Sequence, residues 1–409
     1  MIKNWLKNIG PGPLVAAAFI GPGTVTLCTL AGVGFGFALL WAMILSIVAT
    51  IVLQEMSARI GIITQKGLAD IIRSEIKNKS VRNLAILLIL SAIVIGNAAY
   101  EAGNISGGVL GLETILTNTY ITVGDWSINS LPTILGLLAF ILLYIGNYKV
   151  LEKTLISLVI LMSIAFLLTA ILTKPDLTQI FKGAFIPSFP ENSILVIMGL
   201  IGTTVVPYNL FLHASLVKEK WKDANDLKYA RKDTYIAIIL GGMVSMCIII
   251  SAAAIQAQEI NNAADLALGL EPLFGSYAKY FLAIGLFAAG VTSAITAPLA
   301  AAYVAAGCLG WTSNLKSRKF RAVWIFVLSV GVLFSSFGIK SIEIIKFAQV
   351  ANGLLLPVIA GFLLWLMNKG SILGKYKNSL TQNVLGFVIL GFAVFLGLKS
   401  ILKVFNIIQ

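Results

Sequence analysis

Two short segments place helix-breaking and polar residues inside apolar stretches. The first is Gly21-Pro22-Gly23-Thr24, and the second runs from Thr203 to Asn209 around Pro207. Proline removes a backbone donor and glycine is a poor helix former, so each segment predicts an interrupted helix, unwound at 21–24 and at 205–208. The amides at the start of a half-helix, with the positive end of its dipole, suit a carboxylate group. The two segments are therefore predicted to bind a solute.

Two ionisable residues in apolar stretches carry groups that could move a proton. His213 is the only histidine of the chain, and Glu101 lies in an apolar run. Histidine titrates in the physiological pH range, and a carboxyl group inside a membrane span is a functional candidate by default. We predict proton coupling for both. The alternative for His213 is an inner-gate residue whose ring is satisfied by a neighbouring carbonyl. The alternative for Glu101 is a charge near the outer part of its helix that water can reach.

The polar residues at the interruptions are neutral, which favours a small organic solute. Threonine, asparagine and glutamine side chains offer donors and acceptors without charge, and a tyrosine offers a ring face and a hydroxyl. Glycine allows a ligand to approach the backbone closely, so larger side chains at Gly21 or Gly23 should block uptake. The predicted substrate-binding residues are Gly21, Gly23, Thr24, Thr203, Val206, Tyr208, Asn209 and Gln349.

The composition places these residues in a membrane. Of the 409 residues, 58% are hydrophobic and 11% are charged, whereas soluble proteins have about 45–50% apolar and about 25% charged residues. Apolar runs long enough to cross a bilayer predict an all-α polytopic membrane protein with eleven helices. Their predicted positions are 12–34, 38–60, 84–112, 130–147, 152–173, 193–216, 234–256, 276–305, 322–338, 343–367 and 384–404.

The positive charges predict the orientation of these helices. With the N-terminus in the cytoplasm, 23 of the 30 Lys and Arg residues fall on the cytoplasmic side. This distribution follows the positive-inside rule and explains the net charge of +13 without a nucleic-acid partner. We predict a multi-pass protein of the plasma membrane, with the N-terminus inside and the C-terminus outside.

The two interrupted helices are the first and the sixth, which begin two consecutive blocks of five. Matched interruptions of this kind are typical of inverted-repeat transporters. We predict one transmembrane core over residues 1–383, with repeats at about 1–173 and 193–367. Residues 384–409 form a peripheral eleventh helix, and the protein is expected to be a monomer.

Several stretches resemble the Nramp metal-ion transporters. Leu53-Gln54-Glu55-Met56-Ser57-Ala58-Arg59 and the residues up to Ala69 look like the end of their helix two, and Pro207-Tyr208-Asn209-Leu210-Phe211-Leu212-His213 looks like their helix six. The segment from Gly285 to Gly290 with Thr296, and the segment from Gln349 to Pro357, resemble helices eight and ten. The resemblance implies the LeuT-type fold of the sodium-coupled amino-acid symporters, with a 5+5 inverted repeat plus an eleventh helix.

The chain departs from this family at the metal site. Metal-transporting members carry Asp-Pro-Gly-Asn in helix one, and the Asp and Asn positions are Gly21 and Thr24 here. Their helix-six Met and His positions are Val206 and Tyr208. A helix-three Asp and Glu linked to proton movement align with Asn97 and Tyr100, and Glu101 lies one residue further on. We include Asn97 among the predicted proton-coupling residues. Gln349 and His213 match positions linked to ligand or proton handling in the family.

The prediction from the sequence is a secondary active importer of a small organic solute, such as a carboxylate, an amino acid or a cyclic amide, coupled to protons or sodium. A divalent metal needs charged or soft ligands in a dry site, and their loss predicts no micromolar binding of Mn²⁺ or Fe²⁺ between the interruptions. The alternative is uptake of a divalent ion of the Mn or Mg type through a remodelled site. A transporter-derived sensor is less favoured, and an enzyme, a cofactor and a resident metal are not expected.

Overall fold

The computed structural model describes residues 10–11, 20–116, 119–123, 126–146, 149–255 and 260–405. Within these residues, nine helical segments are long and apolar enough to cross a membrane, and two shorter apolar helices join them. Each of the eleven predicted spans coincides with one of these segments, although residues 12–19 of the first span lie outside the described residues. The prediction of a polytopic helical protein is confirmed.

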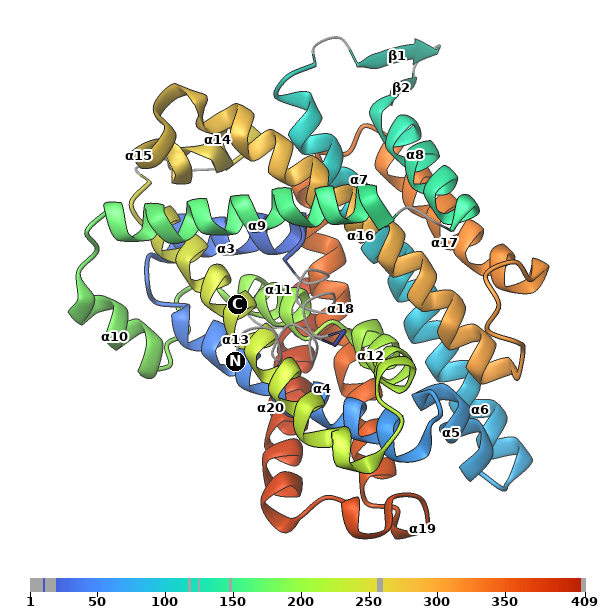
Figure 1. The fold of residues 1–409 in the computed structure, drawn as a ribbon. Helices are drawn as coiled ribbons and strands as arrows, with labels where there is room; N and C mark the ends of the chain where they lie inside the picture. Colours follow the sequence, from blue (N-terminus) through green and yellow to red (C-terminus); the bar gives the residue numbers. More distant parts are fainter. Residues whose placement is uncertain are drawn as a thin grey trace.

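The membrane-spanning elements follow the chain order of Figure 1. They are α3 (Pro22–Phe35), α4 (Leu40–Thr64), α6 (Lys79–Leu90) continuing through a π-helical turn (Ser91–Ile95) into α7 (Gly96–Glu113), α8 (Leu131–Ile145), α9 (Lys149–Leu172), α11 (Ile194–Thr204) with α12 (Pro207–Lys220), α13 (Leu227–Ala252), α16 (Ala278–Leu309), α17 (Arg318–Ser336), α18 (Ser341–Met367) and α20 (Leu380–Val404).

Short elements form the connections. They are α5 (Leu68–Glu75), α10 (Leu177–Phe185), α14 (Ala263–Ala267), α15 (Glu271–Phe274), α19 (Gly370–Leu373) and the strands β1 (Tyr120–Val123) and β2 (Trp126–Asn129). The strands pair antiparallel with Tyr120 opposite Asn129, a hairpin that the sequence analysis did not predict. The hairpin lies at one end of the molecule, and α5 and α19 lie at the other (Figure 1).

Helix α7 is the centre of the packing, because it contacts α16, α17 and α18. Its glycines permit this close approach. A β-carbon at Gly107 would collide with Pro22 of α3, and one at Gly108 would collide with Leu135 of α8. Small residues let helix backbones come together where no hydrophobic effect drives them. The glycines of this helix therefore serve packing, as the sequence indicates.

The sixth span is interrupted, as predicted, but over a shorter segment. Helix α11 ends at Thr204, α12 begins at Pro207, and only Val205 and Val206 lie between them. In the first span, Gly21 is extended and α3 begins at Pro22. The predicted unwound segments 21–24 and 205–208 were too long. A proline needs no amide partner in the first turn of a helix, so each proline starts a helix rather than standing in a loop.

Helices α11 and α18 pack so closely that a methyl group at their contact should destabilise the protein. A β-carbon at Gly202 would collide with the backbone carbonyl of Gln349. Gly202→Ala should therefore lower the unfolding free energy by about 1–3 kcal/mol through overpacking. Gly361→Ala in α18 is the control, because no atom lies within 4 Å of its added β-carbon. Thermal unfolding in detergent measures both, and an equal melting temperature for the two variants would contradict the prediction.

Candidate functional site

The two interruptions meet inside the protein. The hydroxyl oxygens of Thr24 on α3 and Thr203 on α11 lie 2.8 Å apart and form a hydrogen bond. Both side chains are fully buried. The start of α3 is therefore fixed against the end of α11 by two of the predicted substrate-binding residues.

Gln349 of α18 closes a second side of this region. Its side chain lies directly against Gly23, where an added β-carbon would collide with its amide nitrogen. Gly21 faces the hydroxyl of Ser293 on α16, which a β-carbon at Gly21 would approach to 3.0 Å. Gly21 and Gly23 are thus positions where protein side chains approach the backbone closely. The close approach of a ligand at these glycines stays a prediction. Ser293 was missed, because a serine among the small residues of a packing helix gives no distinctive signal.

Tyr208 begins the second half of the broken sixth span and packs on Tyr100 of α7. The ring centroids lie 5.5 Å apart in an edge-to-face arrangement, and both residues are buried. The Tyr100 side chain is also close to that of Gln349. Tyr100 was not among the predicted site residues, although the sequence analysis places it where the metal-transporting family has a glutamate. That alignment was the available signal.

Buried polar atoms without a hydrogen-bond partner gather around these residues. In the described part of the chain they include the Tyr208 hydroxyl, the Gln349 carbonyl oxygen, both amide atoms of Asn209 and the Ser293 hydroxyl. An unsatisfied buried polar group costs about 1–3 kcal/mol, so native proteins rarely retain several together. Such a cluster is typical of a surface that receives a polar ligand.

Glu101 adds the one carboxylate near this cluster. It is fully buried on α7, and its side chain packs against Gly331 of α17. The amide of Asn104 donates to its Oε2 atom at 3.2 Å, while its Oε1 atom has no partner among the described residues. Glu101 is close enough to Tyr100 and Tyr208 to interact with both electrostatically.

The metal chemistry of the site is limited to oxygen donors. Val206, at the interruption of the sixth span, is buried and offers neither sulfur nor imidazole. Within the described residues, no three His, Cys, Asp or Glu side chains gather as a metal-binding group.

The other two predicted proton-coupling residues, His213 and Asn97, form hydrogen bonds outside this cluster. The Nδ1 atom of His213 is 2.8 Å from the Gln54 carbonyl oxygen, and its Nε2 atom is 3.4 Å from the Thr234 hydroxyl. The neighbouring carbonyl of the alternative interpretation is thus present, and it belongs to the Gln54 side chain rather than to the backbone. Asn97 donates to the carbonyl of Ala297 on α16 at 2.8 Å, and an amide cannot titrate in the physiological range.

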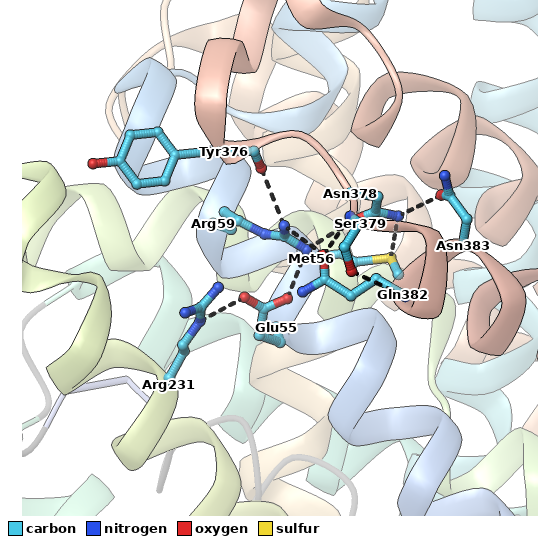
Figure 2. Close-up of polar contacts among 9 residues, drawn as sticks. All are labelled: Glu55, Met56, Arg59, Arg231, Tyr376, Asn378, Ser379, Gln382 and Asn383. Atoms are coloured by element: carbon cyan, nitrogen blue, oxygen red, sulfur yellow. Dashed lines mark hydrogen bonds and ion pairs between the residues drawn. The ribbon is translucent and has the colours of Figure 1, made fainter.

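A separate polar network joins α4 to the segment between α18 and α20 (Figure 2). Arg59 is buried and donates to Glu55 at 2.9 Å, to Asn378 at 2.9 Å and to the carbonyl of Tyr376 at 3.1 Å. Glu55 and Arg59 stand four residues apart in the sequence, a spacing that lets such a pair form on a helix, and their ion pair measures 2.9 Å. Both terminal nitrogens of this buried guanidinium have acceptors, while its Nε atom has none among the described residues. Because two of the acceptors lie between α18 and α20, the network holds the eleventh helix to the core.

The fold and this site define a class of protein. Membrane-spanning helices surround two interrupted spans, and buried polar side chains converge where the interruptions meet. Irregular backbone at membrane depth occurs where it lines a substrate path, and this arrangement is that of a secondary transporter.

The chain belongs to the Nramp family. Residues 12–403 match the family described as natural resistance-associated macrophage protein-like. Among curated relatives, the divalent metal cation transporter MntH of Verminephrobacter eiseniae is 26% identical over 386 residues, covering 91% of this chain and 84% of the relative. The metal transporter Nramp1 of Populus trichocarpa is 29% identical over 433 residues, covering 98% of this chain and 76% of the relative.

A solved structure confirms the fold. The manganese transporter of Eremococcus coleocola, in complex with an aromatic bis-isothiourea compound, superimposes with a TM-score of 0.77 at 22% identity, covering 98% of this chain and 87% of that one. The predicted LeuT-type fold and membership of the Nramp family are thus confirmed, and the protein is a multi-pass membrane transporter. The predicted organic solute has no support from these relatives, whose names specify metals.

The contact between Gly23 and Gln349 generates a prediction about transport. Gly23→Ala forces the Gln349 side chain away from α3, so the rate of uptake by the purified protein in proteoliposomes should fall by about tenfold or more. Gly34→Ala is the matched control on the same helix, because its added β-carbon has no atom within 4 Å. Equal uptake by the two variants, at equal melting temperature, would show that this contact has no part in transport.

Proposed function

We propose that this transporter moves a divalent cation and binds it through oxygen donors at the meeting point of the two interruptions. The curated relatives reported above are named as a divalent metal cation transporter and a metal transporter, and the related solved structure as a manganese transporter. This was the alternative reading of the sequence. The observation that carries it is Glu101, a fully buried carboxylate that interacts electrostatically with Tyr208 and whose Oε1 atom has no hydrogen-bond partner among the described residues.

The donor set favours a hard cation. Hydroxyl, amide and carboxylate oxygens are the ligands of magnesium and calcium, whereas manganese and iron transport in this family uses a sulfur ligand that Val206 replaces. Glu101 supplies one negative charge and forms no ion pair among the described residues. Magnesium keeps several waters when bound and is commonly held through one or two carboxylates. A hydrated magnesium ion therefore fits this site better than a dehydrated manganese ion.

A small organic solute is the second candidate, favoured by the neutrality of the groups at the interruptions themselves. Thr24, Thr203 and Asn209 carry no charge, and all three are buried. Thermal stabilisation separates the candidates, since a ligand that binds only the folded state raises the melting temperature. Stabilisation by millimolar Mg²⁺, and none by a panel of small carboxylates and amino acids, supports the cation. The reverse pattern would replace the proposal.

Substitution of Glu101 tests the cation site directly. Glu101→Gln keeps the shape of the side chain and removes its charge, so uptake of Mg²⁺ into proteoliposomes should fall by about 10- to 100-fold. Glu113→Gln on the same helix is the control, because Glu113 binds Asn129 at the end of α7. A magnesium-responsive dye inside the vesicles reports entry. Unchanged uptake in Glu101→Gln would remove Glu101 from the site.

Coupling to protons is a separate proposal, for which His213 is the test. Its buried imidazole bridges Gln54 and Thr234, so a proton taken up there alters contacts of α12 with both α4 and α13. His213→Gln should abolish accumulation driven by an imposed pH gradient while leaving exchange of substrate between the two sides intact. Loss of both activities would indicate a folding or binding defect instead, and unchanged accumulation would point to sodium or to uncoupled transport.

The predicted orientation and organisation are retained as proposals. The Lys-rich connections that hold α5 and α19 lie at the same end of the molecule, as a common cytoplasmic side requires (Figure 1). We propose that the N-terminus is cytoplasmic, the C-terminus is outside, the core is an inverted repeat and the protein is a monomer in the plasma membrane.

A further inference from the structure

We infer that three residues near the start of α13 form a clasp that closes the substrate path at the end of the molecule where α12 joins α13. The residues are Arg231, Asp233 and Thr234, called here the α13 clasp. This inference rests on the transporter class and not on the identity of the cargo.

Each residue of the α13 clasp contacts a different element. Arg231 donates from Nε to Glu55 of α4 at 2.8 Å (Figure 2). Asp233 accepts from the amide of Gly10 at 3.0 Å, and the Thr234 hydroxyl lies 3.4 Å from Nε2 of His213 on α12. Since residues advance about 100° each around a helix, the three side chains fan over about 160° of the surface of α13. One helix end thus contacts Gly10, α4 and α12.

Gly10 lies against the same junction that the α13 clasp contacts. Gly10 lies so close to the Trp221 ring that a β-carbon at this position would collide with it. Trp221 follows α12 directly, and its carbonyl accepts from the Gln65 side chain beyond α4 at 3.2 Å. These contacts place Gly10 over the junction of the same helices that the clasp joins.

A closed state needs such a device, because the candidate site is sealed from solvent. Tyr208 and Glu101 are 0% exposed and Gln349 is 1% exposed, so no ligand reaches them unless helices separate. Helix α12 begins at the interruption beside Tyr208 and carries His213 to the clasp. Movement of α12 away from α13 would therefore open a path from this end to the site.

One contact of the α13 clasp, that of Arg231 with Glu55, is of a kind that can be released. The Arg231 side chain is 39% exposed and holds Glu55 through one nitrogen, whereas the Arg59 side chain is 2% exposed and has several acceptors. Exposed ion pairs contribute little to stability, so Arg231 can leave Glu55 while Arg59 keeps that carboxylate paired. Arg59 is the fixed partner of Glu55, and Arg231 is the exchangeable one.

The test measures access to the site from each side of the membrane. A reporter cysteine, Val206→Cys, is placed in a background that carries Cys28→Ala, Cys247→Ala and Cys308→Ala. A membrane-impermeant thiol reagent is then applied to vesicles of both orientations. Arg231→Gln and Asp233→Ala should each raise the labelling rate about two- to fivefold from the clasp side only, as expected for loss of one exposed contact.

Lys232→Gln is the matched control, since Lys232 lies between these residues and is exposed. It should leave both labelling rates unchanged. Equal rises from both sides of the membrane would indicate general loosening of the fold and would overturn the inference. Unchanged labelling in Arg231→Gln and Asp233→Ala, or an equal rise in Lys232→Gln, would overturn it as well.

Discussion

The rest of the structure depends on how the protein protects the backbone hydrogen-bonding groups that are exposed where a helix is interrupted inside a membrane. Val205 and Val206 separate two half-helices, and the lipid offers no water to the groups they expose. The interruption persists only because α3, α7 and α18 enclose it. The Thr24–Thr203 hydrogen bond and the close packing of Gly202 on α18 fix that enclosure. The same enclosure creates the buried polar site. The packing that protects the interrupted backbone from lipid therefore also forms the candidate substrate site.

Charge is distributed unevenly around this enclosure. The groups at the interruptions are neutral, and the nearby carboxylate of Glu101 comes from α7, a helix that belongs to the surrounding packing. A cation at the site would therefore be held by one helix of the enclosure and by the two broken spans together. Relative movement of these parts would change its coordination, which is how binding and conformational change become linked in a transporter.

The polar contacts outside the site divide into fixed and exchangeable ones. Arg59 is buried among several acceptors and ties α4 to the segment before α20, so the eleventh helix is bound to the core by polar as well as apolar contacts. Arg231 is half exposed and shares Glu55 with Arg59. A carboxylate with two guanidinium partners can lose one without becoming an unpaired buried charge, which would be costly.

The sequence by itself determined the membrane class, the eleven spans, the two interruptions and the family, because apolar length, proline and glycine act locally along the chain. It also indicated Glu55 with Arg59, a pair one helical turn apart. It could not place Ser293 against Gly21 or Tyr100 against Tyr208, since these contacts join helices distant in the chain. Nor could it show that Glu101 is fully buried among the packed helices and interacts electrostatically with Tyr208 of the sixth span. Whether a site is neutral depends on which helices pack together, and only the tertiary structure decides that.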